Sequence, residues 1–99
     1  MVSVQAVDNR RRDTRRPSDD LIRWKRPGRI EDHKGWSIDA SASSLGFLAD
    51  RRSAPCVGER LNVRRLDGER WTTIDRPVWV ARTMPASSDD LVFVGCMID

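Results

Sequence analysis

The sequence predicts an all-β protein: a small six- to seven-stranded antiparallel β-barrel with a flexible basic N-terminal arm. Three observations lead to this prediction. Apolar residues occur in short runs that alternate with polar residues, which is typical of half-buried strands. Turn-forming residues separate the runs at regular intervals, as in sandwiches and barrels. No stretch has the periodicity of a convincing helix, and closure into a barrel removes exposed sheet edges.

The chain is expected to divide into an Arg-rich arm, residues 1–16, and a barrel domain, residues 17–99. The arm is polar and has no apolar face to bury, so we expect it to become ordered only in part or on binding. Nine of the 18 Lys and Arg residues lie in the first 29 positions, and eight of those nine are Arg. A guanidinium forks onto phosphate or guanine and stacks on bases, so this bias favours a phosphorylated or nucleotide-like partner.

The first predicted strand covers residues 21–26, where Ile22 and Trp24 share one face and charged residues the other. A polar loop at residues 31–35 follows and holds His33, which we expect at the surface. With no partner nearby in the sequence, this histidine is not predicted to be a ligand or a base.

The second predicted strand, residues 36–41, is the most informative. Trp36 and Ile38 point to one face, and the polar residues of the strand point to the other. The period of two therefore sets Asp39 and Ser41 side by side.

Five more strands are predicted, at residues 45–49, 61–66, 69–75, 78–82 and 91–98. Gly46 lies inside the first of these and indicates a bulge, a barrel corner or a close backbone approach. Asp67-Gly68 predicts a type I′ hairpin turn. The four tryptophans all lie at strand positions, so packing in the core is their default interpretation.

No catalytic motif is found, so the protein is not predicted to be an enzyme. Cys56 and Cys96 are far apart and neither belongs to a metal-ligand group, so both are expected to be buried thiols, without a metal or cofactor. No apolar run approaches the ~18 residues of a membrane span, and the N-terminus lacks a signal pattern. A cytoplasmic protein without membrane insertion is therefore expected.

The arginine cluster has three interpretations: a solvated basic tail, a non-specific contact with nucleic acid, or a clamp for a compact anion. The spacing favours the clamp. Arg11 and Arg15 are four residues apart, as are Arg12 and Arg16, and Pro17 follows directly.

These residues resemble the signature of PilZ domains, the bacterial receptors for cyclic di-GMP. That signature is Arg-x-x-x-Arg, then some twenty to thirty residues, then Asp/Asn-x-Ser-x-x-Gly. Residues 11–17 resemble its first half, residues 39–44 its second half, and Leu45-Gly46-Phe47 the apolar-Gly-apolar step that follows. The resemblance extends from about residue 10 to residue 99 and implies a PilZ-like barrel.

The resemblance also implies a binding site for cyclic di-GMP. Arg11 and Arg15 would hold the phosphates and the O6 and N7 edge of guanine. Arg12 and Arg16 are the alternative pair, because the register of the motif is ambiguous by one residue. Asp39 would accept hydrogen bonds from guanine N–H groups.

Two serines complete the implied site. Ser41 would hydrogen-bond the ligand or the backbone, and Ser44 stands where the signature has its final glycine. If that position needs a positive φ, serine costs about 1 kcal/mol and weakens binding up to ~tenfold.

The resemblance thus implies a cyclic di-GMP receptor or adaptor whose arm closes over the ligand and creates a surface for an effector protein. The alternative is a degenerate PilZ-like adaptor that no longer binds the nucleotide, as some members of the family are. A basic arm that binds nucleic acid is disfavoured but remains a third hypothesis. We expect a monomer or a weak dimer.

Overall fold

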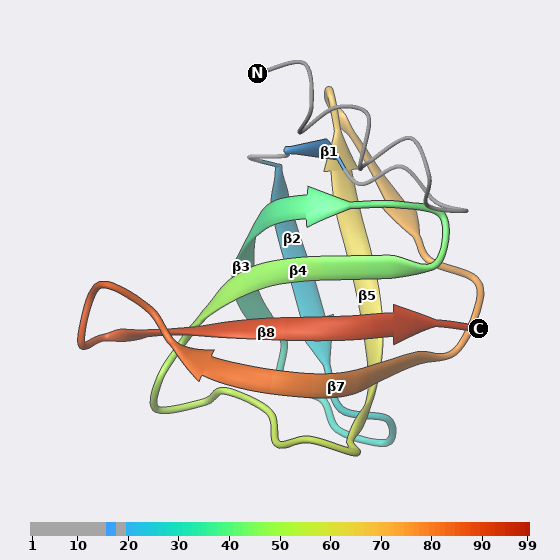
Figure 1. The fold of residues 1–99 in the computed structure, drawn as a ribbon. Helices are drawn as coiled ribbons and strands as arrows, with labels where there is room; N and C mark the ends of the chain where they lie inside the picture. The colour runs from blue at the N-terminus through green and yellow to red at the C-terminus, as the bar shows by residue number, and fades with distance from the viewer. Residues whose placement is uncertain (1–15, 18–19) are drawn as a thin grey trace.

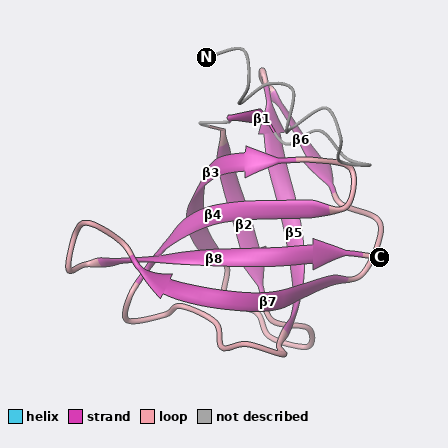
Figure 2. Ribbon diagram, in the orientation of Figure 1, coloured by secondary structure: helices cyan, strands magenta, loops and turns pink. Residues whose placement is uncertain are grey.

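The computed structural model describes residues 16–17, by their backbone alone, and residues 20–99. The described residues form strands and loops without a helix (Figures 1 and 2), which confirms the predicted all-β class. No helix in this part of the chain is therefore long and apolar enough to cross a membrane. The strands are β1 (Arg16–Pro17), β2 (Leu21–Lys25), β3 (His33–Ala40), β4 (Ser44–Asp50), β5 (Arg60–Asp67), β6 (Arg70–Thr73), β7 (Val78–Pro85) and β8 (Leu91–Ile98).

Six strands form a closed antiparallel ring in the order β3-β2-β5-β7-β8-β4, and the ring closes where β4 pairs with β3. The short strand β6 pairs with β5, and the two residues of β1 pair with the end of β3. The predicted barrel of six to seven strands is confirmed. The proposed arm falls mainly on residues 1–15, outside the described residues, so its boundary at residue 16 stays a prediction.

The buried apolar core comes from the inward-facing residues of β2, β4, β5, β7 and β8, and β3 adds the partly buried Ala40. Trp24 and Phe47 are its largest members, and their rings pack with centroids 6.2 Å apart. Ile22 is also fully buried, which confirms the predicted inward face of β2. The remaining core residues are Leu45, Ala49, Leu61, Val63, Val78, Val80, Val94 and Cys96.

The predicted packing of Trp36 in the core is wrong. Trp36 is 44% exposed, and it is the small residues Gly35 and Ser37 that face the core. The reason is steric: a Cβ on Gly35 would lie 2.9 Å from the Phe47 ring and 3.0 Å from Ile22. Large side chains on β4 and β2 fill the barrel here, so β3 must present its smallest residues.

The other tryptophans divide in the same way. Trp24 is fully buried, whereas Trp71 and Trp79 are each 39% exposed, so the core prediction holds for only one of the four. A barrel of six strands has a narrow interior that side chains fill completely, and bulky residues on alternate positions must then lie outside.

Three local predictions also need correction. His33 belongs to β3, where its ring stacks on Trp24 with centroids 4.5 Å apart, because the strand begins three residues earlier than expected. Cys56 is exposed, while Cys96 is buried, and that burial raises the pKa of the Cys96 thiol to about 12. The β5–β6 loop is Gly68-Glu69, and only Gly68 has a positive φ, as in a type II′ turn.

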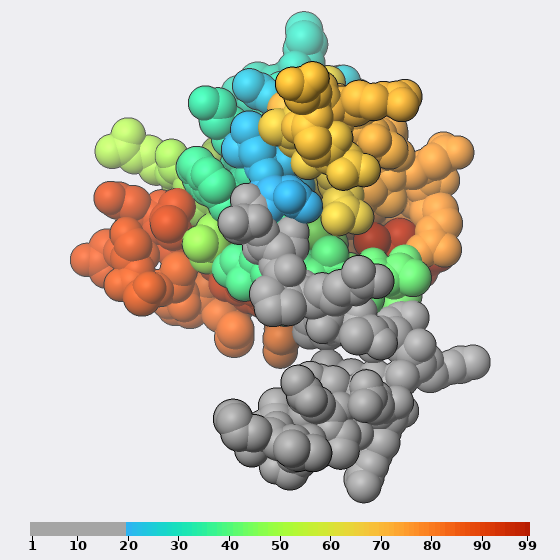
Figure 3. All heavy atoms as spheres, turned by 90° about the horizontal axis from the view of Figure 1, so that it is seen from above, coloured from blue at the N-terminus to red at the C-terminus, as the bar shows by residue number. Residues whose placement is uncertain are grey.

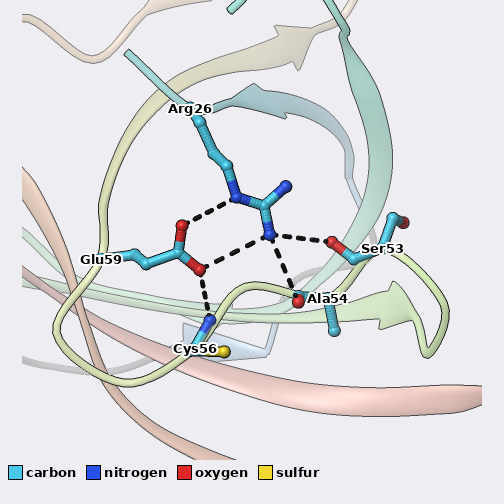
Figure 4. A network of polar contacts seen from close by, with 5 residues as sticks. All are labelled: Arg26, Ser53, Ala54, Cys56 and Glu59. Atoms are coloured by element: carbon cyan, nitrogen blue, oxygen red, sulfur yellow. Dashed lines mark hydrogen bonds and ion pairs between the residues drawn. The ribbon is translucent and has the colours of Figure 1, made fainter.

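A polar network ties the loop between β4 and β5 to the end of β2 (Figure 4). The Arg26 Nε donates to Glu59 Oε1 at 2.7 Å, and its Nη2 lies 3.4 and 3.5 Å from the carbonyl oxygens of Ser53 and Ala54. Glu59 Oε2 also accepts from the Cys56 backbone N–H at 2.6 Å. The Arg26 hydrogen bond, followed by the Cys56 N–H, lowers the pKa of Glu59 from its ordinary value.

Replacing Glu59 by Gln tests this network. We expect Glu59→Gln to lower the free energy of unfolding by about 1 kcal/mol at pH 7, because an ion pair and a carboxylate hydrogen bond are weakened. A lowered folded pKa stabilises the protein above the ordinary glutamate pKa of 4.5 and ceases to do so as the pH falls through the folded value. Urea unfolding from pH 7 down to pH 3 should therefore show the gap between wild type and variant closing below about pH 4.5.

The matched control is Glu69→Gln in the β5–β6 loop, where the carboxylate makes no hydrogen bond or ion pair with the described residues. Its effect at pH 7 should stay within about 0.5 kcal/mol. A Glu59→Gln gap that persists unchanged at pH 3 would show that the network does not stabilise through the ionised carboxylate.

Candidate functional site

A β-bulge near the end of β3 directs Asp39 to the outside of the barrel. The β3–β4 register passes from the Ser37–Phe47 pair to the Asp39–Gly46 pair and leaves Ile38 as the extra residue. Ser37 is buried, so strict alternation would turn Asp39 inward as well. The extra residue places Asp39 on the outward face beside Gly46. The prediction that all polar residues of this strand share one face is therefore wrong for Ser37, which faces the core.

A second bulge does the same for an arginine on β7. The β7–β8 register passes from the Val80–Cys96 pair to the Arg82–Gly95 pair and leaves Ala81 as the extra residue. Val80 is 2% exposed, so alternation alone would aim Arg82 at the core. The bulge instead brings the guanidinium to the outer surface over Gly95.

The two bulges lie at opposite ends of one cross-strand row, Asp39–Gly46–Gly95–Arg82, which we call the glycine row. The aromatic ring of Phe93 lies over the middle of the row. A Cβ on Gly46 would stand 2.9 Å from this ring, and one on Gly95 would stand 3.3 Å from it. Arg82 in turn lies over the ring, with its guanidinium carbon 5.8 Å from the centroid.

Gly46 is required for the position of the acid. A Cβ at this residue would lie 2.6 Å from Asp39 Oδ1, a distance that non-bonded atoms do not adopt. The glycine therefore lets the carboxylate lie flat on β4 beside Phe93. This confirms the close approach that an isolated glycine in an apolar strand predicts.

The turn between β3 and β4 is held by its own serines. The Ser41 N–H donates to the Ser44 carbonyl oxygen at 2.9 Å, and the two hydroxyl oxygens are 2.8 Å apart. The Ser43 N–H lies 3.3 Å from Ser41 Oγ. Among the described residues only glycines have a positive φ, so Ser44 does not carry the backbone strain that a glycine would relieve.

A shallow hollow of about 300 Å³ adjoins this turn and the glycine row. Ser44 borders it on β4, Arg82 on β7, and Gly95 and Met97 on β8. The Ser44 hydroxyl and the Arg82 guanidinium border this depression, and Asp39 and Phe93 lie beside it on the glycine row. These groups are of the kinds that bind a flat polar ligand.

Several solved structures are similar to this one, and two of them show its fold class. The Bacillus subtilis inhibitor of motility (MotI/DgrA) superposes with a TM-score of 0.71 at 15% identity, over 91% of this chain and 42% of that one. The PilZ domain of YcgR from Escherichia coli, solved with c-di-GMP, superposes with a TM-score of 0.64 at 12% identity, over 90% of this chain and 77% of that one. This chain has the fold of a PilZ domain. No family model and no curated protein matches the sequence.

The PilZ fold brings part of the predicted site together. Asp39 lies against Gly46, and the Ser41 hydroxyl meets that of Ser44. Since Ser44 and Gly46 are alternate residues of β4, the acid and the hydroxyls share the outward face at its beginning.

The predicted arginines stand differently. The backbone of Arg16 pairs with Ala40, and that of Pro17 pairs with Asp39. The C-terminal end of the predicted arm therefore lies beside Asp39. Arg11, Arg12 and Arg15 lie outside the described residues, and their part in the site stays a prediction.

Arg82 and Phe93 belong to this surface of the PilZ fold but are not apparent from the sequence. The available signal is the pair of glycines, Gly46 and Gly95, each inside an apolar strand. Two such glycines indicate that something approaches the backbone, but only the strand pairing shows that they face one another and what lies over them.

The serine turn makes a prediction about Ser44. We expect Ser44→Ala to lower the free energy of unfolding by about 1 kcal/mol, because the hydroxyl bond to Ser41 is lost. Ser44→Gly should cost about 0.5–1 kcal/mol more, because glycine gains freedom in the unfolded chain and no strain is relieved. Chemical denaturation of the two variants measures the difference. A glycine variant more stable than the alanine variant would show that this position is strained in the native protein.

Proposed function

We propose that this chain is a cyclic di-GMP-binding signalling receptor whose N-terminal arginine arm closes over the ligand on the barrel face. The observation that carries the proposal is the glycine row, where two bulges turn Asp39 and Arg82 outward on either side of two glycines that Phe93 covers. The PilZ domain of YcgR, solved with c-di-GMP, has the same fold and supports the choice of ligand.

The chemistry of the row suits a guanine nucleotide. A carboxylate accepts hydrogen bonds from the N–H groups on one edge of guanine, and Asp39 is held in place for this by the glycine beneath it. Phe93 and Arg82 present a flat ring and a guanidinium, which stack on a purine. Arginines four apart in the arm, Arg11 and Arg15 or Arg12 and Arg16, would fork onto the phosphates.

The path of the chain supports closure of the arm. β1 pairs with β3 opposite Ala40 and Asp39, so the arm begins at the acid end of the glycine row. A ligand lying on the row would therefore be within reach of arginines a few residues before Arg16. The protein would act by binding rather than catalysis, in the cytoplasm, as a monomer or weak dimer that presents the closed arm to an effector protein.

A degenerate adaptor is the second candidate, and one contact favours it. The hydroxyls of Ser41 and Ser44 already satisfy each other at 2.8 Å, so a ligand must compete for them. An adaptor of this kind would use the same barrel for protein contacts without the nucleotide.

Calorimetric titration with cyclic di-GMP tests the proposal. The wild type should bind saturably at micromolar concentration, and Arg15→Ala should weaken binding at least about tenfold, because a guanidinium–phosphate hydrogen bond contributes about 1.5–3 kcal/mol. The matched control is Arg70→Ala in β6, an exposed arginine away from the row. No heat from the wild type at high ligand concentration would refute binding and favour the adaptor, whereas steeply salt-dependent binding to any oligonucleotide would favour a nucleic-acid contact.

A second prediction isolates the residue that the sequence did not reveal. Arg82→Ala should weaken binding of cyclic di-GMP about two- to thirtyfold, as expected for a stacking contact of about 0.5–2 kcal/mol. Arg82→Lys keeps the charge but not the planar group, so its affinity for cyclic di-GMP should lie between those of the alanine variant and the wild type. The same titration measures both. Equal affinity of wild type and Arg82→Ala would remove the β7 end of the row from the site.

A further inference from the structure

The barrel wall that does not carry the glycine row has an apolar row on its outer face. Trp36 of β3 pairs with Leu21 of β2, and Leu66 of β5 pairs with Trp71 of β6. The β2–β5 ladder ends at the Ile22–Arg65 pair, and Leu21 and Leu66 are the next residues beyond it. The four side chains therefore lie in one row across β3, β2, β5 and β6. Trp36 is 44% exposed and Trp71 39%. We call this set the Trp–Leu row.

A basic row runs beside it. Lys34, Arg23, Arg64 and Thr73 pair in turn across the same four strands. They lie two residues along each strand from the Trp–Leu row, a separation of about 7 Å. Figure 3 shows these strands side by side, with the blue residues of β2 between the teal residues of β3 and the yellow hairpin of β5 and β6.

The basic row borders a hollow of about 550 Å³ that includes Lys25 and Arg64 in its lining. One acid, Asp32, reaches into it, with its Oδ2 2.8 Å from Arg64 and 3.4 Å from Arg23. A single carboxylate thus pairs with two guanidiniums. The lysines on either side, Lys25 and Lys34, make no ion pair with the described residues. The face keeps an excess of positive charge.

We propose that the Trp–Leu row and the basic row together form a docking surface for an acidic amphipathic segment of a partner protein. Its apolar stripe would cover the tryptophans and leucines, and its carboxylates would lie along the basic row. Tryptophan and arginine are the residues that contribute most to binding energy at protein interfaces, and here they adjoin one another. The charge of the face selects an acidic partner.

Other occupants fit less well. A second copy of this chain, docked face to face about a two-fold axis, would bring the two basic rows close to each other. A membrane would have to take up the row itself, but both tryptophans are more than half covered, the Arg64 guanidinium lies 5.5 Å from the centroid of the Trp71 ring, and Ile30 is the one largely exposed apolar side chain among the described residues that line the hollow. Asp32 would also face anionic lipid or phosphate with a like charge.

This inference does not depend on the nucleotide. The two rows lie on β3, β2, β5 and β6. Of these strands, only β3 also carries a residue of the glycine row. Figure 1 shows the division, with β4, β8 and β7 in front and β2 and β5 behind. The surface is therefore present in a receptor and in an adaptor alike.

The test uses the whole chain, labelled with ¹⁵N, and a synthetic helical peptide of about five turns that carries a leucine stripe beside a glutamate stripe. A peptide of the same composition in scrambled order is the control. Saturable shifts of the Trp36 and Trp71 indole N–H signals with the amphipathic peptide alone are expected. Affinity should fall at least tenfold for the double variant Lys25→Glu, Lys34→Glu and for Trp71→Ser, and stay unchanged for Arg51→Glu in the β4–β5 loop.

The two lysines are exposed, so their reversal keeps the fold, which the unshifted remainder of the spectrum would verify. Equal binding of both peptides would overturn the proposal in favour of non-specific charge. So would shifts caused only by phosphatidylglycerol vesicles, by an oligonucleotide, or by raising the protein concentration, which indicate a membrane, a nucleic acid and a second copy respectively. Adding cyclic di-GMP to the same sample reports on the glycine row through Gly46 and Gly95, so failure of one proposal is distinguished from failure of the other.

Discussion

In a closed barrel every second residue of a strand must face the core, and the candidate site depends on the two places where this protein interrupts that rule. Without the extra residues Ile38 and Ala81, the alternation of β3 and β7 would carry Asp39 and Arg82 into the apolar interior. An ion left without a partner there costs several kcal/mol. The bulges remove this conflict and at the same time place two opposite charges at the ends of one outer row.

The glycines follow from the same geometry. β4 has an aromatic ring on each side, Phe47 in the core and Phe93 on the outer surface, and both lie where a neighbouring strand has no side chain. Gly35 makes room for the inner ring, while Gly46 and Gly95 make room for the outer one. At Gly46 the backbone of β4, the Asp39 carboxylate and the Phe93 ring are therefore in close contact.

The sequence predicts the barrel well because alternation and turn residues are local signals. It also groups Asp39 with Ser41 and finds the close approach at Gly46. It does not say which of two faces is inward, and on β3 the expectation that Trp36 packs in the core is wrong, because the space is taken by Phe47 from another strand. The contact between Arg82 and Phe93 depends on a bulge and on strand pairing, and neither can be predicted from a single sequence.

Strand β3 connects the two proposed surfaces. It presents Trp36 to the Trp–Leu row and, three residues later, Asp39 to the glycine row, with the bulged Ile38 between them. The chain that pairs with this stretch is the same in both cases: β1 lies opposite Asp39, the Asp20 carbonyl accepts from the Ser37 N–H at 2.8 Å, and Leu21 then pairs with Trp36. On the proposed function, a ligand on the glycine row and a partner on the docking surface would both contact β3, within three residues of each other. The two proposed surfaces are therefore adjacent along one strand, and β1 and β2 both pair with it.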